Sequence, residues 1–450
     1  MPDLEAFVFQ TVFDDLPADV LAIMQRSVLD TIGVAAVGSQ SEISKITTQY
    51  AKDFWAAGGN APSASLMFDG SRVSPSGAAF AGAFMLDSID AHDGHSPVKG
   101  HAGSAIFPAL IGFCEAREYA GNPVSGQEFI TAMAIGYEIG YRSGLTLHAT
   151  QEDYHTSGAW TAVGVAAMGA RLLGLTHDQM LQAIGIAEYH GPRSQMMRCI
   201  DFPTMLRDGV GWGAPSGVTA AYLAREGFTG APALTCEGEE AAPFWDGLGE
   251  RWLTLEHTHY KLYPCCRWAH SSIDGAQKLM QDNGLVHTDV ARVEIRTFHY
   301  ATRLAGYEPK TLDEFSYSIA FPVAAMIVRG QVGVPELAEE TLQDPEILRI
   351  SQATRLIDDP HLTEISVGKR WALVTIVMKD GMRFTSPPRT PRGDTDLPLS
   401  DAEIAEKFHL FADPVLGVTR ANELQDLSGS FDSLSAAEFS RLLDLCLTKP

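Results

Sequence analysis

The chain has 450 residues and a formal charge of −23; 45% of its residues are apolar and 20% are charged. This composition is typical of a folded globular protein, and the length predicts two structural units in one compact subunit. The strong negative charge excludes a general surface for polyanions, so we expect no nucleic acid and no anionic membrane among its partners. A small anion can still bind where a local basic pocket outweighs the global field.

Cysteine usage and the first residues of the chain predict a cytoplasmic protein. The six cysteines follow no disulfide-scaffold or metal-binding spacing, and in a chain of this size we expect them to be reduced. The chain begins without a basic segment followed by an apolar stretch, so we expect no signal peptide. We also expect no transmembrane helix, because we find no apolar stretch of about 18 residues or more.

Residues 1 to about 255 are predicted to be helical. Pro17 starts the first strong helix, whose apolar residues recur at helical spacing from Val20 to Ile32. Three later segments, 159–173, 180–186 and 217–224, are rich in alanine, glycine and valine. Small residues let two helix axes approach closely, so these segments predict a tightly packed helical core.

The segment 86–110 gathers ionisable residues between two apolar helical runs, 78–86 and 105–113. These residues are Asp87, Asp90, His92, Asp93, His95, Lys99 and His101. A packed core has no use for so many ionisable groups without partners. The segment is therefore either a solvated loop or the wall of a polar cavity, and its charge density favours the cavity.

Two chemistries fit this segment. A metal site requires ligand spacing that only His92 and His95 offer, and only weakly. Acid–base catalysis requires a histidine whose tautomer and pKa are set by a nearby carboxylate, which the segment supplies several times. The pattern favours acid–base catalysis.

Three further segments are candidates, each with a plain structural alternative. His155 precedes a small-residue helix, where Thr156 or Ser157 would cap the helix and His155 would be a bystander. Arg207 precedes a glycine-rich turn and could clamp a carboxylate, or lie on the surface at a helix start. The segment 259–270 mixes basic residues, aromatics and two cysteines at the junction of the two units, where active sites often lie; a nucleophilic cysteine has little support there.

After residue 261 the pattern changes to strands and helices. Segments 290–297 and 371–378 alternate apolar and polar residues, and Asp380–Gly381 predicts a tight turn into 382–385. Helical patterns occupy 318–329 and 344–354, and a capping box at Ser400 to Glu403 begins the C-terminal helices. The fold class is therefore mainly α: a large all-helical domain from residues 1–258 and 395–450, and a smaller α+β lid domain at 259–394.

Six blocks in order, over roughly 400 residues, resemble the MmgE/PrpD family. The blocks are 13–17 with 29–34, 90–95 with 100–104 and 108–110, 155–158, 208–212 with 227–230, 261–264, and 270 with 273–274. The resemblance implies a helical domain built from both chain ends, a smaller lid and a homodimer, with no metal and no organic cofactor. The family's activities include 2-methylcitrate dehydration, cis-aconitate decarboxylation and iminodisuccinate epimerisation. All of them transfer a proton beside a carboxylate of a di- or tricarboxylate.

The resemblance also implies site residues. The pocket positions of the decarboxylase branch match Asp90, His101, His155, Lys261 and His270. Three positions depart from that branch: Arg207 replaces a lysine, Gly94 a threonine and Phe321 a tyrosine. The loss of the tyrosine hydroxyl removes a proton donor, so we expect a reaction other than cis-aconitate decarboxylation.

We therefore expect a cofactor-independent enzyme that dehydrates a small di- or tricarboxylate, with epimerisation of a dicarboxylate such as iminodisuccinate as the alternative. His101 is the expected acid–base residue, oriented by Asp90, with His155 as a second proton donor and with Lys261 and Arg207 binding carboxylates. The other expected substrate-binding residues are Asp93, His95, His270 and Phe321. Rival interpretations are a metal-dependent hydrolase built on Asp90, His92, His95 and His101, and a non-catalytic helical scaffold.

Overall fold

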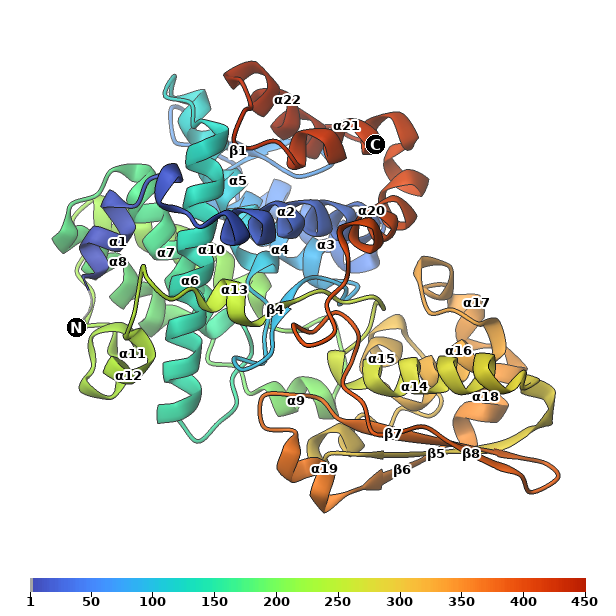
Figure 1. Ribbon diagram of the computed structural model, residues 1–450. Helices are drawn as coiled ribbons and strands as arrows, with labels where there is room; N and C mark the ends of the chain where they lie inside the picture. Colours follow the sequence, from blue (N-terminus) through green and yellow to red (C-terminus); the bar gives the residue numbers. More distant parts are fainter. Residues whose placement is uncertain (1–2) are drawn as a thin grey trace.

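The protein is mainly helical, as expected, and a computed structural model describes its residues 3–450 (Figure 1). The helices that precede residue 258 are α1 Leu4–Gln10, α2 Ala18–Gly38, α3 Glu42–Phe54, α4 Pro75–Asp87, α5 Gly103–Tyr119, α6 Gly126–Thr150, α7 Gly158–Leu173, α8 His177–His190, α9 Met196–Asp201, α10 Val210–Arg225, α11 Leu234–Glu237, α12 Ala242–Trp245 and α13 Leu253–His257. The chain ends in α20 Asp401–Leu416, α21 Val418–Ser428 and α22 Ala436–Leu447.

Between these two groups lie the remaining helices and the main sheet. The helices are α14 Arg267–Asn283, α15 Leu312–Ser316, α16 Ala320–Arg329, α17 Glu339–Leu342, α18 Pro345–Gln352 and α19 Pro360–Ile365. The strands are β5 Val290–Thr297, β6 Arg355–Asp358, β7 Ala372–Met378 and β8 Arg383–Thr385. Two short antiparallel pairs lie outside this sheet: β1 Ala64–Ser65 with β2 Arg72–Val73, and β3 Gly94–His95 with β4 Thr258–His259.

The first predicted helix is confirmed as α2. Pro17 stands at its N-cap position, and Val20 and Ile32 are fully buried. Contrary to our expectation, α2 is long and apolar enough to span a membrane by length and composition, and 67% of its most apolar window is buried inside the fold.

The small-residue segments form α7 and α10 and part of α8, and they confirm the close packing predicted for them. A Cβ atom at Gly213 would lie 2.5 Å from the carbonyl oxygen of Gly158, and one at Gly217 would lie 2.5 Å from that of Ala162. These glycines of α10 therefore let the helix approach α7. The glycine-rich turn after Arg207, which we expected beside a ligand, is largely the packed start of α10.

The main sheet has the strand order β6-β5-β7-β8. β5 pairs in parallel with β6 and antiparallel with β7, and β7 forms an antiparallel hairpin with β8. The predicted turn is confirmed, with Gly381 at a φ of +92°. Helices α14, α16 and α18 lie along the sheet (Figure 1) and cover its apolar face, which includes Val293, Ile295, Val374 and Ile376. We did not predict β6.

Two large hydrophobic cores organise the molecule. One joins the helices before residue 254 to side chains of α20–α22, such as Phe408 and Leu443. The blue α2 and the red α20 accordingly lie side by side (Figure 1). Between these two helices, Lys407 donates to Asp30 at 2.6 Å. The other core is formed by residues 263–378 and by three residues of α9, including Ile200. Residues of α9 thus pack against the unit that we expected to be separate from them; the domain boundaries stay a prediction.

Candidate active site

The ionisable segment between α4 and α5 is largely buried except for Lys99, which is exposed, and this excludes the solvated-loop interpretation. Asp90, His92, Asp93 and His95 are each at most 3% exposed. Asp90 and Lys99 adopt left-handed backbone conformations, with φ of 51° and 57°. Such conformations are costly for residues with side chains and cluster at functional sites.

This loop forms one wall of a cavity whose other walls come from distant parts of the chain. Segments on both sides of residue 258 contribute, so the cavity lies where the two cores meet. Its lining residues are Asp90, His95, Ser96, Lys99, Gly100, His101, Tyr154, Met196, Asp208, His259, Lys261, Cys266, Arg267, Trp268, Tyr317 and Arg370. Four of the residues expected from the sequence are among them: Asp90, His95, His101 and Lys261.

His101 is held in the tautomer that suits a base. Its Nδ1 lies 2.6 Å from the backbone oxygen of Asp93, which can only accept, so Nδ1 carries the proton and Nε2 keeps its lone pair. Burial, followed by the charges of Lys261 and His92, holds the pKa of His101 well below its usual value. The ring is therefore neutral near pH 7. The orienting group is the Asp93 carbonyl rather than the Asp90 carboxylate that we expected.

Lys261 and Asp90 form a fully buried ion pair. The Lys261 Nζ donates to the Asp90 carboxylate and, at 3.1 Å, to the Asp90 carbonyl oxygen. Both side chains are at most 4% exposed. Three more cations, Lys99, Arg267 and Arg370, line the cavity against only two carboxyl groups, those of Asp90 and Asp208. The cavity thus carries an excess of positive charge in a strongly acidic protein.

Asp93 and His95 support the loop. Asp93 accepts from the Tyr137 hydroxyl at 2.8 Å and from the Gly103 amide at 3.2 Å. The Nδ1 of His95 accepts from the Val98 amide at 3.1 Å, and its ring stacks on Tyr141. Asp93 does not line the cavity, although we expected it to bind substrate.

Four other expected residues lie outside the cavity lining. His155 forms a backbone bridge with Gln195. Arg207 pairs with Asp313 at 2.6 Å, in a neighbouring cleft, and the ring of the cavity residue Tyr317 lies beside its guanidinium. The other two are His270, whose ring bonds to Arg267 and to the Cys265 carbonyl, and Phe321, which packs on Phe315 in the second core.

Several cavity residues received no role from the sequence, chief among them Arg370 and His259, the first residue of the candidate segment 259–270. His259 lies opposite Gly94 in the β3–β4 pair, and Ser96 contacts its Nδ1 at 3.0 Å. A Cβ at Gly94 would lie 2.6 Å from the His259 Nε2, so the glycine makes room for this ring. Arg370 follows a turn far along the chain. Nothing near Arg370 in the sequence indicates that it reaches the cavity.

Asp208 lies in the block 208–212 that resembles the family, but we assigned no role to it from the sequence. It lines the cavity at the start of α10 and is 3% exposed. Its carboxylate contacts the Ser157 hydroxyl, and its amide donates to Asp87 at 3.0 Å. Burial, followed by the charge of Asp87, raises the pKa of Asp208 well above its usual value.

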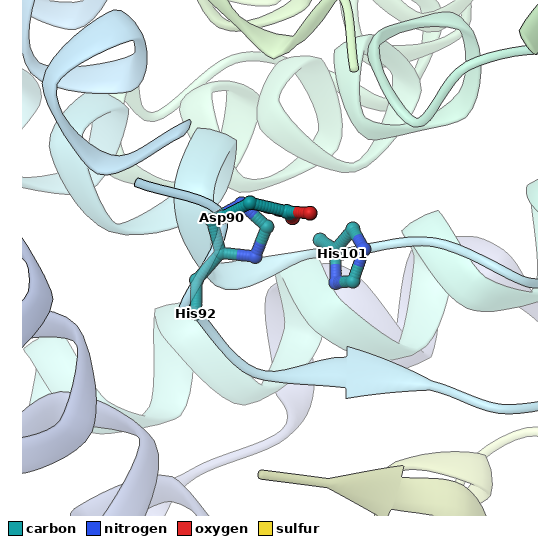
Figure 2. Close-up of side chains that lie close together, drawn as sticks. All are labelled: Asp90, His92 and His101. Atoms are coloured by element: carbon teal, nitrogen blue, oxygen red, sulfur yellow. The ribbon is translucent and has the colours of Figure 1, made fainter. Parts of the chain in front are cut away.

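One group of side chains has a geometry that could hold a metal ion. Donor atoms of Asp90, His92 and His101 lie within 4.8 Å of one another, and Figure 2 shows the three side chains close together. The Lys261 ammonium, however, is bonded to the Asp90 carboxylate, and His92 Nε2 is 3.2 Å from Asp87. A cation bound by these three residues would have to displace or face that ammonium, so the donor set fits a metal poorly.

The cavity cysteine is not prepared for nucleophilic attack. Cys266 lines the cavity, but burial, followed by the charge of Asp90, raises the pKa of its thiol to about 12. A thiol with so high a pKa carries little thiolate at neutral pH.

Comparison with known proteins places the chain in a family. The model of the MmgE/PrpD N-terminal domain matches residues 2–246, and that of the C-terminal domain matches residues 263–433. A cis-aconitate decarboxylase of Aspergillus terreus is 25% identical, over 96% of this chain and 92% of its own length. The human cis-aconitate decarboxylase is 24% identical, over 88% of this chain and 84% of its own. A cis-aconitate decarboxylase-like protein of Aspergillus oryzae is 25% identical over 96% of this chain and 94% of its own.

The two family models together span most of the sequence. The gap between them, from residue 246 to residue 263, lies where the chain passes from the first core to the second. The chain therefore belongs to the MmgE/PrpD family.

Proposed function

We propose that the protein is a lyase that dehydrates a small di- or tricarboxylate without an organic cofactor. The observation that carries this proposal is a neutral, oriented His101 in a cavity lined by four cations. Removal of a proton beside a carboxylate places a second negative charge on that carboxylate. Fixed cations in a buried site stabilise such a charge far more than water does.

Each component has a defined task in this reaction. The Nε2 of His101 accepts the proton from carbon, because its Nδ1 is already protonated and bonded to Asp93. Lys261, Arg267 and Arg370 hold the carboxylates; Arg267 is itself fixed by Asp394 at 2.5 Å and by His270 at 3.2 Å. The membership in a family whose curated relatives act on cis-aconitate supports a polycarboxylate as substrate.

The test is alkene formation from a panel of hydroxy di- and tricarboxylates. We expect wild-type turnover on at least one of them, and a loss of about 100-fold or more in His101→Ala. His190→Ala, at an exposed position, is the matched control and should keep full activity. Undiminished turnover by His101→Ala would remove this residue from the role of base.

Decarboxylation of cis-aconitate is the second candidate function. The replacement of a tyrosine by Phe321 argues against it, because phenylalanine offers no hydroxyl. Two observations favour it all the same: two of the curated relatives named above are cis-aconitate decarboxylases, and Tyr317, a residue with a hydroxyl, lines the cavity. Release of carbon dioxide from cis-aconitate, absent in His101→Ala, would establish this reaction in place of dehydration. Epimerisation of a dicarboxylate stays the third alternative, and return of the proton to carbon without alkene formation would reveal it.

The metal-dependent hydrolase is disfavoured by the ammonium of Lys261 at the Asp90 carboxylate. We expect a chelator to leave the turnover unchanged and metal analysis of the purified protein to find no stoichiometric ion. Loss of activity to the chelator, restored by one divalent metal, would support the hydrolase interpretation instead.

We also propose that the protein is a cytoplasmic homodimer. A contiguous aromatic cluster reaches the surface at α3 and the start of α10, where Tyr50, Phe54 and Trp212 are 40%, 71% and 50% exposed. Exposed apolar patches of this kind mark association surfaces. Light scattering should give the mass of a dimer, and Phe54→Glu should lower it; a wild-type monomer would contradict the proposal.

A further inference from the structure

Elimination of a hydroxyl group needs an acid as well as a base, because hydroxide is a poor leaving group. The sequence suggested His155 for the second proton, but His155 does not line the cavity. The acid must lie in the same cavity as His101 and hold a proton at the pH of the reaction. Among the cavity residues, Asp208 meets both conditions.

Asp208 and His101 both form hydrogen bonds with the hydroxyl group of Ser157. The backbone amide of His101 donates to the Ser157 hydroxyl oxygen at 2.9 Å, and that hydroxyl contacts the Asp208 carboxyl group. The Gly158 amide also donates to the Asp208 carbonyl oxygen at 3.1 Å. The start of α7 therefore fixes the distance between the base and this carboxyl group. The two residues that flank Asp208 both adopt left-handed backbone conformations, with φ angles of 51° at Arg207 and 71° at Gly209.

The charges around Asp208 favour its protonated form. Three buried carboxyl groups, those of Asp87, Asp90 and Asp208, converge here. Asp90 is bonded to the Lys261 ammonium and Asp87 lies 3.2 Å from the His92 ring. No ion pair within residues 3–450 includes Asp208, and the adjacent Arg207 turns to Asp313. A buried carboxyl group that faces two others and has no cation of its own keeps its proton.

We propose that Asp208 is the general acid that protonates the leaving hydroxyl group while His101 removes the proton from carbon. The C–H bond breaks and its electron pair forms the C=C bond. The C–O bond breaks with its electron pair on oxygen, which takes the Asp208 proton and leaves as water. His101 is then an imidazolium and Asp208 a carboxylate, and the return of one proton through solvent restores both. This assignment rests on the proposed dehydration.

The opposite pKa shifts of the two groups agree with these roles. Burial, followed by the charge of Asp87, raises the pKa of Asp208, whereas burial, followed by the charge of Lys261, lowers that of His101. Neighbouring groups whose environments drive their pKa values apart are the usual acid and base of an active site.

The test compares two leaving groups on one carbon skeleton. The substrate found for the wild type is prepared with fluoride in place of the leaving hydroxyl group, because fluoride departs without a proton. Asp208→Asn preserves the shape and an acceptor for Ser157 but has no proton to give. We expect it to lose about 100-fold or more on the hydroxy substrate and to keep wild-type turnover on the fluoro substrate. His101→Gln should lose turnover on both substrates, and Asp201→Asn, at an exposed carboxylate, on neither.

A purely structural role for Asp208 gives a different result. In that case Asp208→Asn would lose the same factor on both substrates, or lose nothing, and either outcome overturns the assignment. Rescue by fluoride in His155→Gln, but not in Asp208→Asn, would move the role to His155. If the wild type eliminates neither leaving group, the proposed dehydration itself fails. The wild-type measurement alone gives this result, so it is distinguishable from failure of the Asp208 assignment, which appears only in the variants.

Discussion

At the scale of single residues, the same burial acts on two groups in opposite directions. It disfavours the charged form of each, so it lowers the pKa of His101 and raises the pKa of Asp208. A neutral imidazole and a neutral carboxyl group are the two forms that acid–base catalysis requires. Burial therefore prepares both before any substrate arrives.

A carboxyl group kept protonated in this way should destabilise the fold at high pH. Because its folded pKa exceeds its unfolded pKa, the folded state binds the extra proton, and stability falls as pH rises from about 4 through the folded pKa. Asp208→Asn has no such proton. We therefore expect the variant to unfold at higher urea concentration than wild type, with a gain that grows with pH across that window. A gain that is constant with pH, or absent, would contradict the raised pKa.

At the scale of elements, the close approach of small-residue helices positions the site. α7 presents Ser157 at its start and α10 presents Asp208 at its own, and glycines let the two helices meet there. The runs of alanine and glycine made this packing predictable from sequence. The capping box of α20 and the alternation in β5 and β7 were equally local signals, and the structure confirms them. β6 was missed because its four residues are too few to show an alternating pattern.

Gly164 tests the helix packing away from the cavity. A Cβ there would overlap the carbonyl oxygen of Gly136 in α6. We expect Gly164→Ala to lower the free energy of unfolding by about 1–3 kcal/mol, because backbone cannot yield to it. The control is Gly58→Ala, at an exposed glycine with no atom within 4 Å of the added Cβ, which should change it by about 0.5 kcal/mol or less. Equal unfolding midpoints in urea for the two variants would contradict the packing argument.

At the scale of the whole molecule, the cavity is assembled from segments that are hundreds of residues apart. The contact between Lys261 and Asp90 spans 171 residues, and that between Lys407 and Ala91 spans 316. The resemblance to a family directed attention to Asp90, His101 and Lys261. It offered no motif for Arg370, since a lone arginine has many plain explanations, and His259 was indicated only by its place in the candidate segment 259–270. Arg207 was expected in the cavity because its neighbours suggested a ligand, but its partner Asp313 lies far along the chain.

Lys407 is the link from the C-terminal helices to the active-site loop. It donates to Asp30 at 2.6 Å and to the Ala91 carbonyl oxygen at 2.7 Å, with its side chain almost fully buried. Lys407→Met leaves a buried carboxylate without a partner, so we expect a loss of about 3–5 kcal/mol in urea unfolding. Asp30→Asn in the same chain should recover part of it. Lys449→Met, which removes an exposed lysine paired with Asp69, should cost about 1 kcal/mol or less, and a Lys407→Met loss no larger than that would contradict this role.

The proposed reaction depends on proton transfer at a carbon beside a carboxylate, and proton NMR in D₂O detects this transfer. The chelator-treated protein would be incubated with methylcitrate, citrate, cis-aconitate, malate, tartrate and iminodisuccinate in turn. We predict that deuterium enters such a carbon of at least one compound, together with a new alkene signal, and that His101→Ala abolishes both. No exchange into any compound, with hydrolysis of an ester or amide appearing only when a metal is added, would instead identify a metal-dependent hydrolase.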